Sequence, residues 1–354
     1  MPATDAGAVW VIDDAPIMGG AEAFAIRLCS WLGAKPREAL IICPDSSELA
    51  SRARAAGVAV LATDFPLPAP RYAAPAAVAL WRLRRLLARA PRDTLLVANT
   101  ARAQAYAILA TRGLRGLRLV SLMHEQDSAR RPSARWSLRR FGGVAAIGDA
   151  GVETYRAALP GRSVARVANF LTPAEIQSIV AARAPAPAAK PPLVGVLSRM
   201  FAGKGIVELI DELASSPQAW SRLRVAAPFQ DAGYSDAVRA RIDAHGLGER
   251  VELLGHVADV GAFLAGVDLI VVPSTATEGQ PTVVLEALAH GRPAIVRAHI
   301  WQSEYEGLPV RRYATAEELA AALTAPTQPA ASAAELEARF DPAVVLDTLE
   351  RAAR

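Results

Sequence analysis

Short runs of Val, Ile and Leu alternate along this chain with longer segments that mix apolar and polar residues. Runs of this length that are apolar throughout are typical of strands buried on both faces of a parallel sheet, and the longer segments predict crossover helices. In the first half the pattern predicts one complete doubly wound α/β sheet. Its expected strands are Val9–Asp13, Ala39–Cys43, Val58–Leu61, Leu95–Asn99, Leu117–Met123 and Val144–Ile147.

An Ala/Pro-rich stretch, Ala181–Pro192 (AARAPAPAAKPP), interrupts the alternation and is typical of a stiff linker. The alternation then restarts and predicts a second sheet. Its expected strands are Leu193–Leu197, Leu223–Ala227, Val251–Leu254, Leu269–Val272 and Ala294–Val296.

The chain is therefore expected to form two Rossmann-like domains, over residues 1–175 and 193–339, joined by a linker at residues 176–192. In open α/β sheets ligands bind at the carboxyl ends of the strands, so we expect the two sheets to face a common cleft. A last helix near Pro342–Ala353, within residues 340–354, is expected to pack back on the first domain.

Composition narrows the class of protein. A length of 354 residues fits two domains of roughly 150 residues each. Hydrophobic residues make up 52% and charged residues 21%, which is ordinary for a globular protein and argues against disorder. The formal net charge of +4 is too mild to indicate a nucleic-acid partner, but it is compatible with an anionic substrate or a membrane surface.

The number of cysteines and the length of the apolar runs indicate the cellular compartment in which the protein is expected. Cys29 and Cys43 are too few for a disulfide framework or a metal cluster, so we expect a reducing compartment and no metal site. Met1–Trp10 lacks the features of a signal peptide, and the longest apolar runs, such as Val267–Pro273, are strand-sized and interrupted by Asp268. We expect a cytoplasmic protein without a membrane span, and peripheral contact with the inner face of a membrane stays open.

The most informative segment is Asp268–Ile295, which reads DLIVVPSTATEGQPTVVLEALAHGRPAI. Its apolar start predicts a buried strand that ends at Pro273. A polar loop follows, and a helix is expected to begin near Pro281, because proline suits the first helical position, and to end near Gly291. This helix is apolar almost all round, so it is expected to lie in the core.

Two glutamates flank the start of this helix. Glu286 lies within it, and an ionised carboxylate on a buried helix is costly unless a partner such as a ligand hydroxyl group compensates. Glu278 lies eight residues earlier, in the loop. Between them, the backbone N–H groups at Gly279–Val283 suit a phosphate or sugar oxygen. The alternative is that Glu278 is a solvated loop residue and that Glu286 pairs with an arginine.

A second segment, Val194–Leu209 (VGVLSRMFAGKGIVEL), places an arginine and a lysine between a strand and a helix. Lysine is scarce in this chain and occurs only at positions 35, 190 and 204, so Lys204 between two glycines is unusual. Arg199 and Lys204 are fixed cations of the kind that stabilise negative charge on a bound group. The alternative is a surface lysine in a turn.

These two segments resemble the donor site of the family 4 retaining glycosyltransferases, which have the GT-B fold of two Rossmann-like domains. The resemblance implies that Glu278 contacts the donor sugar, that Glu286 holds the ribose, and that Arg199 and Lys204 clamp the diphosphate. It further implies backbone contacts to the sugar and the distal phosphate from Gly279, Gln280, Pro281 and Thr282.

Three less specific matches extend the resemblance over the chain. Gly19 and Gly20 follow the first strand, where the family brings its backbone close to the donor phosphates, although glycines before a helix also serve a simple turn. His124, at the end of a strand, corresponds to a histidine that faces the donor sugar across the cleft and stabilises the reaction centre; otherwise it is an ordinary satisfied polar residue. The segment Leu253–Val257 resembles the family's loop near the nucleobase, and this resemblance implies that Val257 bonds the base through its backbone.

The resemblance implies retaining glycosyl transfer from a nucleotide-diphosphate sugar to an unidentified acceptor: a glycan, a lipid-linked molecule or a small molecule. It implies no metal and no cofactor. Two segments depart from the family pattern: Ala226–Phe229 and Arg297–Glu304 replace glycine-rich loops. Two arginine-rich stretches, Trp81–Arg92 and Arg130–Arg140, are either solvated helix faces or surfaces for an anionic membrane or an acidic acceptor.

Two other functions remain open. An NAD-dependent oxidoreductase would use Asp45, after the second strand, to bind a ribose hydroxyl group, but Gly19 and Gly20 do not form its G-x-G-x-x-G loop and the two glutamates are left unexplained. A non-catalytic homologue that only binds a nucleotide sugar is the second alternative, and the presence of both glutamates and both cations argues against it.

Overall fold

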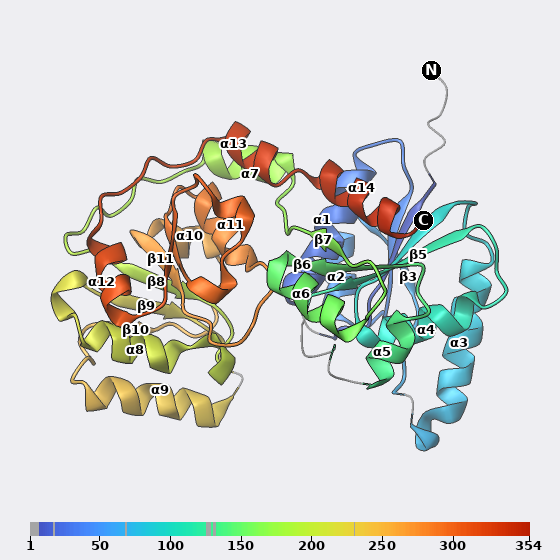
Figure 1. The fold of residues 1–354 in the computed structure, drawn as a ribbon, viewed down its shortest axis with the longest axis horizontal. Helices are drawn as coiled ribbons and strands as arrows, with labels where there is room; N and C mark the ends of the chain where they lie inside the picture. Colours follow the sequence, from blue (N-terminus) through green and yellow to red (C-terminus); the bar gives the residue numbers. More distant parts are fainter. Residues whose placement is uncertain (1–6, 17, 68, 125–128, 130–131, 230) are drawn as a thin grey trace. The chain divides into compact units, whose positions relative to one another are not determined.

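The computed structural model describes residues 7–354 apart from 17, 68, 125–128, 130–131 and 230. The chain divides into two α/β units (Figure 1): the first comprises Met1–Thr172 and Asp341–Arg354, and the second comprises Pro173–Phe340. Each unit has its own parallel sheet with helices on both faces. Among the described residues, no helix is both long and apolar enough to cross a lipid bilayer.

The described part of the first unit forms a seven-stranded sheet in the order β3-β2-β1-β4-β5-β6-β7. Every neighbouring pair is parallel. The six predicted strands are present, with ends that differ by one residue at most, and the short edge strand β7 was not predicted. The strands are β1 (Val9–Ile12), β2 (Ala39–Cys43), β3 (Ala59–Ala62), β4 (Thr94–Ala98), β5 (Leu117–Met123), β6 (Gly143–Ile147) and β7 (Ala165–Val167).

Helices cover both faces of this sheet and close its core. They are α1 (Gly20–Gly33), α2 (Glu48–Ala55), α3 (Ala73–Leu87), α4 (Ala101–Thr111), α5 (Pro132–Leu138), α6 (Gly148–Ala158) and α14 (Pro342–Ala352). The C-terminal helix α14 packs against β5, β6 and β7. Gly143 permits this close approach, because a Cβ atom there would lie 1.9 Å from the carbonyl oxygen of Ala352. Arg37 adds an ion pair to Glu350 of α14, at 2.5 Å.

The described part of the second unit forms a six-stranded parallel sheet in the order β10-β9-β8-β11-β12-β13. The five predicted strands are present, and the edge strand β13 was not predicted. The strands are β8 (Val194–Leu197), β9 (Leu223–Ala226), β10 (Val251–Leu253), β11 (Leu269–Val272), β12 (Ala294–Arg297) and β13 (Val310–Tyr313). The doubly wound α/β fold expected for both halves is thereby confirmed.

The helices of the second unit are α7 (Pro173–Ala181), α8 (Ile206–Ala214), α9 (Ala232–Ala244), α10 (Val260–Ala265), α11 (Thr282–Ala289), α12 (Ala316–Thr324) and α13 (Ala333–Arg339). Residues 176–181, which we expected to begin the linker, instead form the last part of α7. This helix packs against α11 and α13. Ile176 is buried there, which explains why an Ala-rich segment is helical at this place.

Both sheets reverse their chain order at one place, between β1 and β4 in the first unit and between β8 and β11 in the second. The crossovers on either side of such a point leave in opposite directions, so ligands of open α/β sheets bind outside the carboxyl ends of these strands. The residues that directly follow β8 and β11, and those that follow β1 and β4, are therefore the first to consider as a site.

Candidate functional site

The loop after β8 is tied to the loop after β11. A single 3-10 turn, η3 (Ala202–Lys204), follows β8, and the carbonyl oxygen of Gly203 accepts hydrogen bonds from the backbone N–H groups of Thr275 and Ala276, at 3.1 and 3.0 Å. Gly205 ends the turn in the left-handed region with φ of 67°, and a Cβ atom there would lie 2.1 Å from the carbonyl oxygen of Pro273. The glycines around Lys204 therefore allow two loops to pack backbone to backbone.

This packing brings two of the predicted donor-site residues together. Lys204 Nζ donates to Glu278 Oε1 at 2.6 Å, and both side chains are mostly buried, with 16% and 18% of their surface exposed. Arg199 is exposed and lies over the ring of Phe201, 5.3 Å from its centroid, and Lys204 lies 5.7 Å from the same ring. Two cations thus lie beside the ring of Phe201 after β8, and one of them, Lys204, pairs with a carboxylate from the loop after β11.

The segment that leads into α11 is buried against the rest of the unit. Gly279, Gln280 and Pro281 have little exposed surface, and the buried Gln302 donates a hydrogen bond from Nε2 to the carbonyl oxygen of Gly279 at 3.0 Å. Pro281 is the N-cap of α11 and not its first helical residue, so the helix begins one residue later, at Thr282. This start presents backbone N–H groups in the same loop that carries Glu278.

Glu286 is the fifth residue of α11, just over one turn into the helix. The helix packs in the core as expected, through Val284, Leu285 and the alanine and leucine residues that follow, but the side chain of Glu286 itself is half-buried. Its desolvation cost is therefore smaller than a fully buried helix would impose. The predicted contact between Glu286 and a ribose stays a prediction.

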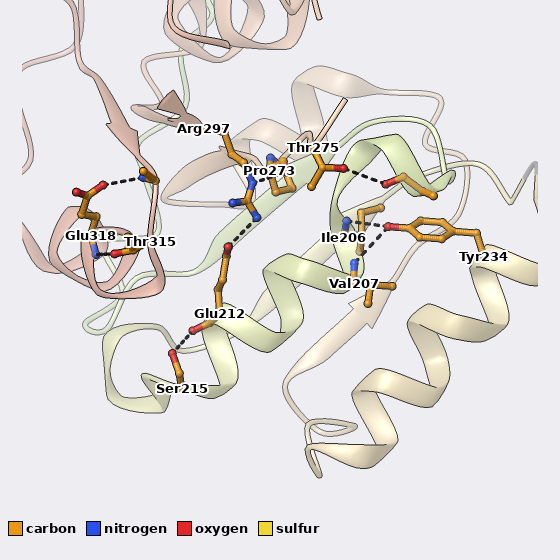
Figure 2. A network of polar contacts seen from close by, with 12 residues as sticks. Ile206, Val207, Glu212, Ser215, Tyr234, Pro273, Thr275, Arg297, Thr315 and Glu318 are labelled. Atoms are coloured by element: carbon orange, nitrogen blue, oxygen red, sulfur yellow. Dashed lines mark hydrogen bonds and ion pairs between the residues drawn. The ribbon is translucent and has the colours of Figure 1, made fainter. Parts of the chain in front are cut away.

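Two polar side chains whose contacts the sequence did not predict, Arg297 and Tyr234, support these loops (Figure 2). Arg297 Nε donates to the carbonyl oxygen of Pro273 at 2.9 Å, and its Nη2 pairs with the mostly buried Glu212 at 2.7 Å. Burial raises the pKa of Glu212, and the guanidinium group of Arg297 opposes that rise. Arg297 therefore fixes the end of β11 just before the loop that carries Glu278.

The second support is at the start of α8. The hydroxyl oxygen of Tyr234 accepts hydrogen bonds from the backbone N–H groups of Ile206 and Val207, at 2.9 and 3.3 Å (Figure 2). Backbone N–H groups in the first turn of a helix have no partner within the helix, so the hydroxyl group takes the place of a capping side chain. Helix α8, which follows Lys204, is thereby fixed by a side chain of α9.

Val257 lies in the loop between β10 and α10, and its side chain is partly exposed. Strand β10 is the edge strand beyond β9, so Val257 follows a different strand from Lys204 and Glu278. Its role next to a nucleobase stays a prediction.

The remaining predicted residues lie in the first unit. Gly19 is the N-cap of α1 and Gly20 its first residue, and both are exposed. His124 follows β5 and shares a hydrogen bond of 2.7 Å with Oδ1 of Asn99, which follows β4. Burial lowers the pKa of His124 to about 3, so the imidazole is neutral at neutral pH. The predicted position of His124 over a donor sugar stays a prediction.

A carboxyl group completes this cluster at the reversal point of the first sheet. Asp13, which directly follows β1, is fully buried and accepts a hydrogen bond of 2.6 Å from Asn99 Nδ2. Burial raises the pKa of Asp13 to about 7, and the nearby Glu22 adds to the rise. Sequence reasoning missed Asp13 and Asn99 as site residues, although each is the last residue of a predicted strand.

Metal-ligating groups are not gathered anywhere in the described part of the chain: no set of three or more His, Cys, Asp or Glu side chains there could hold an ion. Cys29 and Cys43 are both buried and free.

Comparison with known proteins agrees with this division. The family description "Glycosyltransferase Family 4" matches residues 18–170, and "Glycosyl transferases group 1" matches residues 191–326. Each match falls within one of the two units, and the second includes both loops around Lys204 and Glu278. No curated protein matches the chain.

Solved structures of similar fold cover nearly the whole chain. HepE from Anabaena, solved in complex with UDP and glucose, is 22% identical with a TM-score of 0.73, and the match covers 98% of each chain. A glycosyltransferase from Rickettsia africae is 14% identical with a TM-score of 0.69, covering 98% of this chain and 96% of the other. The lipopolysaccharide outer core galactosyltransferase WaaB is 16% identical with a TM-score of 0.67, covering 97% and 94%.

The family descriptions account for most of both units, and the solved structures share the two-sheet architecture over almost their full length. The chain therefore belongs to the family 4 glycosyltransferases and has the GT-B fold.

Proposed function

We propose that the second unit binds a UDP-sugar and that the enzyme transfers its hexose, with retention of configuration, to an acceptor held by the first unit. The observation that carries this proposal is the contact of 2.6 Å between Lys204 and Glu278 at the carboxyl ends of β8 and β11. A cation and a carboxylate lie side by side there, just before a buried helix, and such a pair suits a phosphate and sugar hydroxyl groups.

Each group has a distinct role in this proposal. Lys204 and Arg199 neutralise the diphosphate, whose negative charge grows as the glycosidic bond breaks, and fixed cations lower that barrier. They supply the positive charge that a metal ion supplies in other glycosyltransferases. Glu278 accepts hydrogen bonds from the sugar and Glu286 from the ribose. Backbone N–H groups of Gly279–Thr282 bind the sugar and distal phosphate, and Val257 binds the base.

The choice of UDP and of a hexose is supported by HepE, which has been solved with UDP, with UDP and glucose, and with UDP-glucose. Nearly the whole of this chain follows the HepE fold, with 98% of each chain covered. At 22% identity the likeness supports the proposal without fixing the donor, so guanosine, thymidine and adenosine diphosphates belong in the test.

For the chemical step we propose attack on the face from which the nucleotide leaves. The bond between the anomeric carbon and the phosphate oxygen breaks, the acceptor oxygen bonds to the same face, and the proton of the acceptor hydroxyl group passes to the leaving phosphate. This route needs no covalent nucleophile. Trapping of a glycosyl group on any side chain after incubation with the donor would contradict it.

The test is the release of UDP from UDP-glucose, compared with GDP-, dTDP- and ADP-sugars, in the absence of an acceptor. A competent site transfers some donor to water, so wild-type protein is expected to release UDP slowly. Glu278→Gln is expected to lower the release about 100-fold, because it removes a charged partner of both Lys204 and the sugar.

Glu252→Gln is the matched control. Glu252 also pairs with a basic residue of the second unit, Arg224, at 2.8 Å, but it lies on the edge strand β10 and is exposed. We expect the control to release UDP at the wild-type rate. Failure of wild-type protein to release a nucleoside diphosphate from any donor would refute the proposed activity and favour a non-catalytic nucleotide-sugar binder.

The contacts of Asp45 argue against the oxidoreductase alternative. Asp45, which would have to bind a ribose, pairs with Arg54 at 2.5 Å, and both side chains are exposed. The family matches over both units also favour glycosyl transfer.

For the acceptor side we propose contact with an anionic membrane surface. Trp81 of α3 and Trp136 of α5 expose 56% and 46% of their surface, and the guanidinium groups of Arg85 and Arg140 lie over their rings, at 4.8 and 4.0 Å. An exposed aromatic ring beside a cation suits a lipid headgroup region. Co-sedimentation with vesicles that contain anionic lipid is expected for wild-type protein and reduced for Trp81→Ala; binding to neutral vesicles to the same extent would contradict the proposal.

A further inference from the structure

The side chains of Asp13, Asn99 and His124 form one hydrogen-bonded chain across the carboxyl ends of β1, β4 and β5. The backbone N–H group of Ala15 donates to Asp13 Oδ1 at 2.8 Å, and Asn99 Nδ2 donates to Asp13 Oδ2 at 2.6 Å. The same Nδ2 donates to the carbonyl oxygen of Ala21 at 2.9 Å. The family resemblance named His124, but neither Asp13 nor Asn99.

The contacts of Asn99 decide which way its amide group points. A backbone carbonyl oxygen only accepts hydrogen bonds, so the atom of Asn99 that faces Ala21 is the nitrogen. The same nitrogen faces Asp13, which accounts for both of its hydrogen atoms. The oxygen of Asn99 is therefore the atom that lies 2.7 Å from His124 Nε2.

This orientation decides which nitrogen of His124 carries the proton. Asn99 Oδ1 can only accept, so Nε2 of His124 must donate to it. A neutral imidazole has one proton, which is then on Nε2, and Nδ1 keeps its lone pair. Phe24 packs edge-on against the imidazole, with ring centroids 5.5 Å apart, so an apolar neighbour disfavours the charged ring.

We propose that Asn99 is a positioning residue, oriented by Asp13, that holds His124 as the Nε2-protonated imidazole, so that Nδ1 accepts a hydrogen bond from a substrate hydroxyl group. His124 then acts as an acceptor toward a sugar or acceptor hydroxyl group and does not donate a proton. The part of this inference that concerns substrate rests on the proposed glycosyl transfer, whereas the tautomer is a property of the protein alone.

The tautomer is tested by long-range ¹H–¹⁵N spectra of protein labelled in its histidine rings, without nucleotide. The chain has five histidines, and His124→Gln identifies the signals of His124. In wild-type protein we expect a neutral ring with the proton on Nε2 across pH 6 to 8. A proton on Nδ1, or a charged ring at pH 7, would overturn the proposal without any variant.

Asn99→Leu removes the acceptor, and we expect the ring of His124 then to exchange between both tautomers. Gln104→Leu is the matched control: Gln104 is also a buried amide near the end of β5, and it donates to Met123 Sδ at 2.9 Å, outside the chain of hydrogen bonds. The control is expected to keep the wild-type tautomer. Retention of that tautomer in a folded Asn99→Leu protein would overturn the role of Asn99.

Measurement of kcat and KM distinguishes a role of Asn99 in positioning His124 from a role in folding alone. We expect Asn99→Leu to lower kcat for nucleoside diphosphate release about tenfold with little change in KM, because the proposed contacts to the nucleotide part of the donor all come from the second unit. Gln104→Leu is expected to change neither. An unchanged kcat beside an altered tautomer would refute the contact with substrate, and an inactive wild-type protein with the expected tautomer would refute the proposed function alone.

Discussion

Replacing Gly205 with alanine is expected to destabilise the second unit far more than the same change at Gly246. Both glycines have nearly the same left-handed backbone, with φ of 67° and 65°. An alanine in that region costs about 1–2 kcal/mol at either position. At Gly246 the added Cβ atom meets nothing within 4 Å, so this cost is the whole effect.

At Gly205 the added Cβ atom would lie 2.1 Å from the carbonyl oxygen of Pro273, which is well inside van der Waals contact. The obstacle is backbone that Arg297 holds, and it cannot rotate away as a side chain would. Overpacking of this kind adds about 1–3 kcal/mol, so the total loss at Gly205 is about 2–5 kcal/mol. Relief of this clash requires the backbone around residue 205 to move, which also displaces the neighbouring Lys204. Nucleotide binding is therefore expected to weaken.

Urea unfolding of both variants, followed by circular dichroism and extrapolated linearly to water, measures this difference. The account predicts that Gly205→Ala loses at least about 1 kcal/mol more free energy of unfolding than Gly246→Ala. Equal losses in the two variants would refute the close packing of the loops after β8 and β11.

Two further predictions concern a buried carboxyl group of the first unit and a tyrosine hydroxyl group of the second. Burial raises the pKa of Asp13 from 3.8 to about 7. Between these two values the folded state keeps a proton that the unfolded state has released. The free energy of unfolding therefore falls as the pH rises from about 4 to 7, by up to about 4 kcal/mol. Asp13→Asn is expected to flatten this decline in urea unfolding at pH 5 and pH 7.5, and an unchanged slope would contradict the assignment. Tyr234→Phe leaves two backbone N–H groups of α8 without their acceptor and is expected to cost about 1–3 kcal/mol. Tyr72→Phe, at an exposed tyrosine, is its control, and equal stability of both variants would disprove the capping role.

Most strands of both sheets could be predicted because each corresponds to a local apolar run bounded by polar turn residues. The two edge strands could not. β7 (Ala165–Val167) is only three residues long, and β13 (Val310–Tyr313) carries two arginines because an edge strand meets solvent on one side. The C-terminal helix α14 was recognisable from its own pattern.

The residues predicted for a donor site could be singled out in the sequence because they lie in two contiguous segments around Lys204 and Glu278. The residues that position these segments could not. Arg297 acts on Pro273 across 24 positions of sequence, and Tyr234 acts on Ile206 across 28, so no local pattern announces either contact.

The cluster around His124 shows the same limit. Asp13 and Asn99 lie 86 positions apart, and each looks like an ordinary polar residue after a strand. Only the strand order, which places β1 beside β4 at the reversal point, brings them together. A search of the sequence for residue types would have found neither, because the reversal point is set by topology and not by residue type.

The central claim is that Lys204 and Glu278 belong to a site for a nucleoside diphosphate, and calorimetric titration with UDP tests it directly. Wild-type protein is expected to bind UDP, and Lys204→Met to bind it about 10- to 100-fold more weakly, since a charge-assisted hydrogen bond is lost. Lys35→Met is the control, because Lys35 lies over the ring of Trp31 in the first unit and is expected to leave the affinity unchanged. Equal affinity in wild-type protein and Lys204→Met, or no binding of UDP or any other nucleoside diphosphate by wild-type protein, would contradict the account.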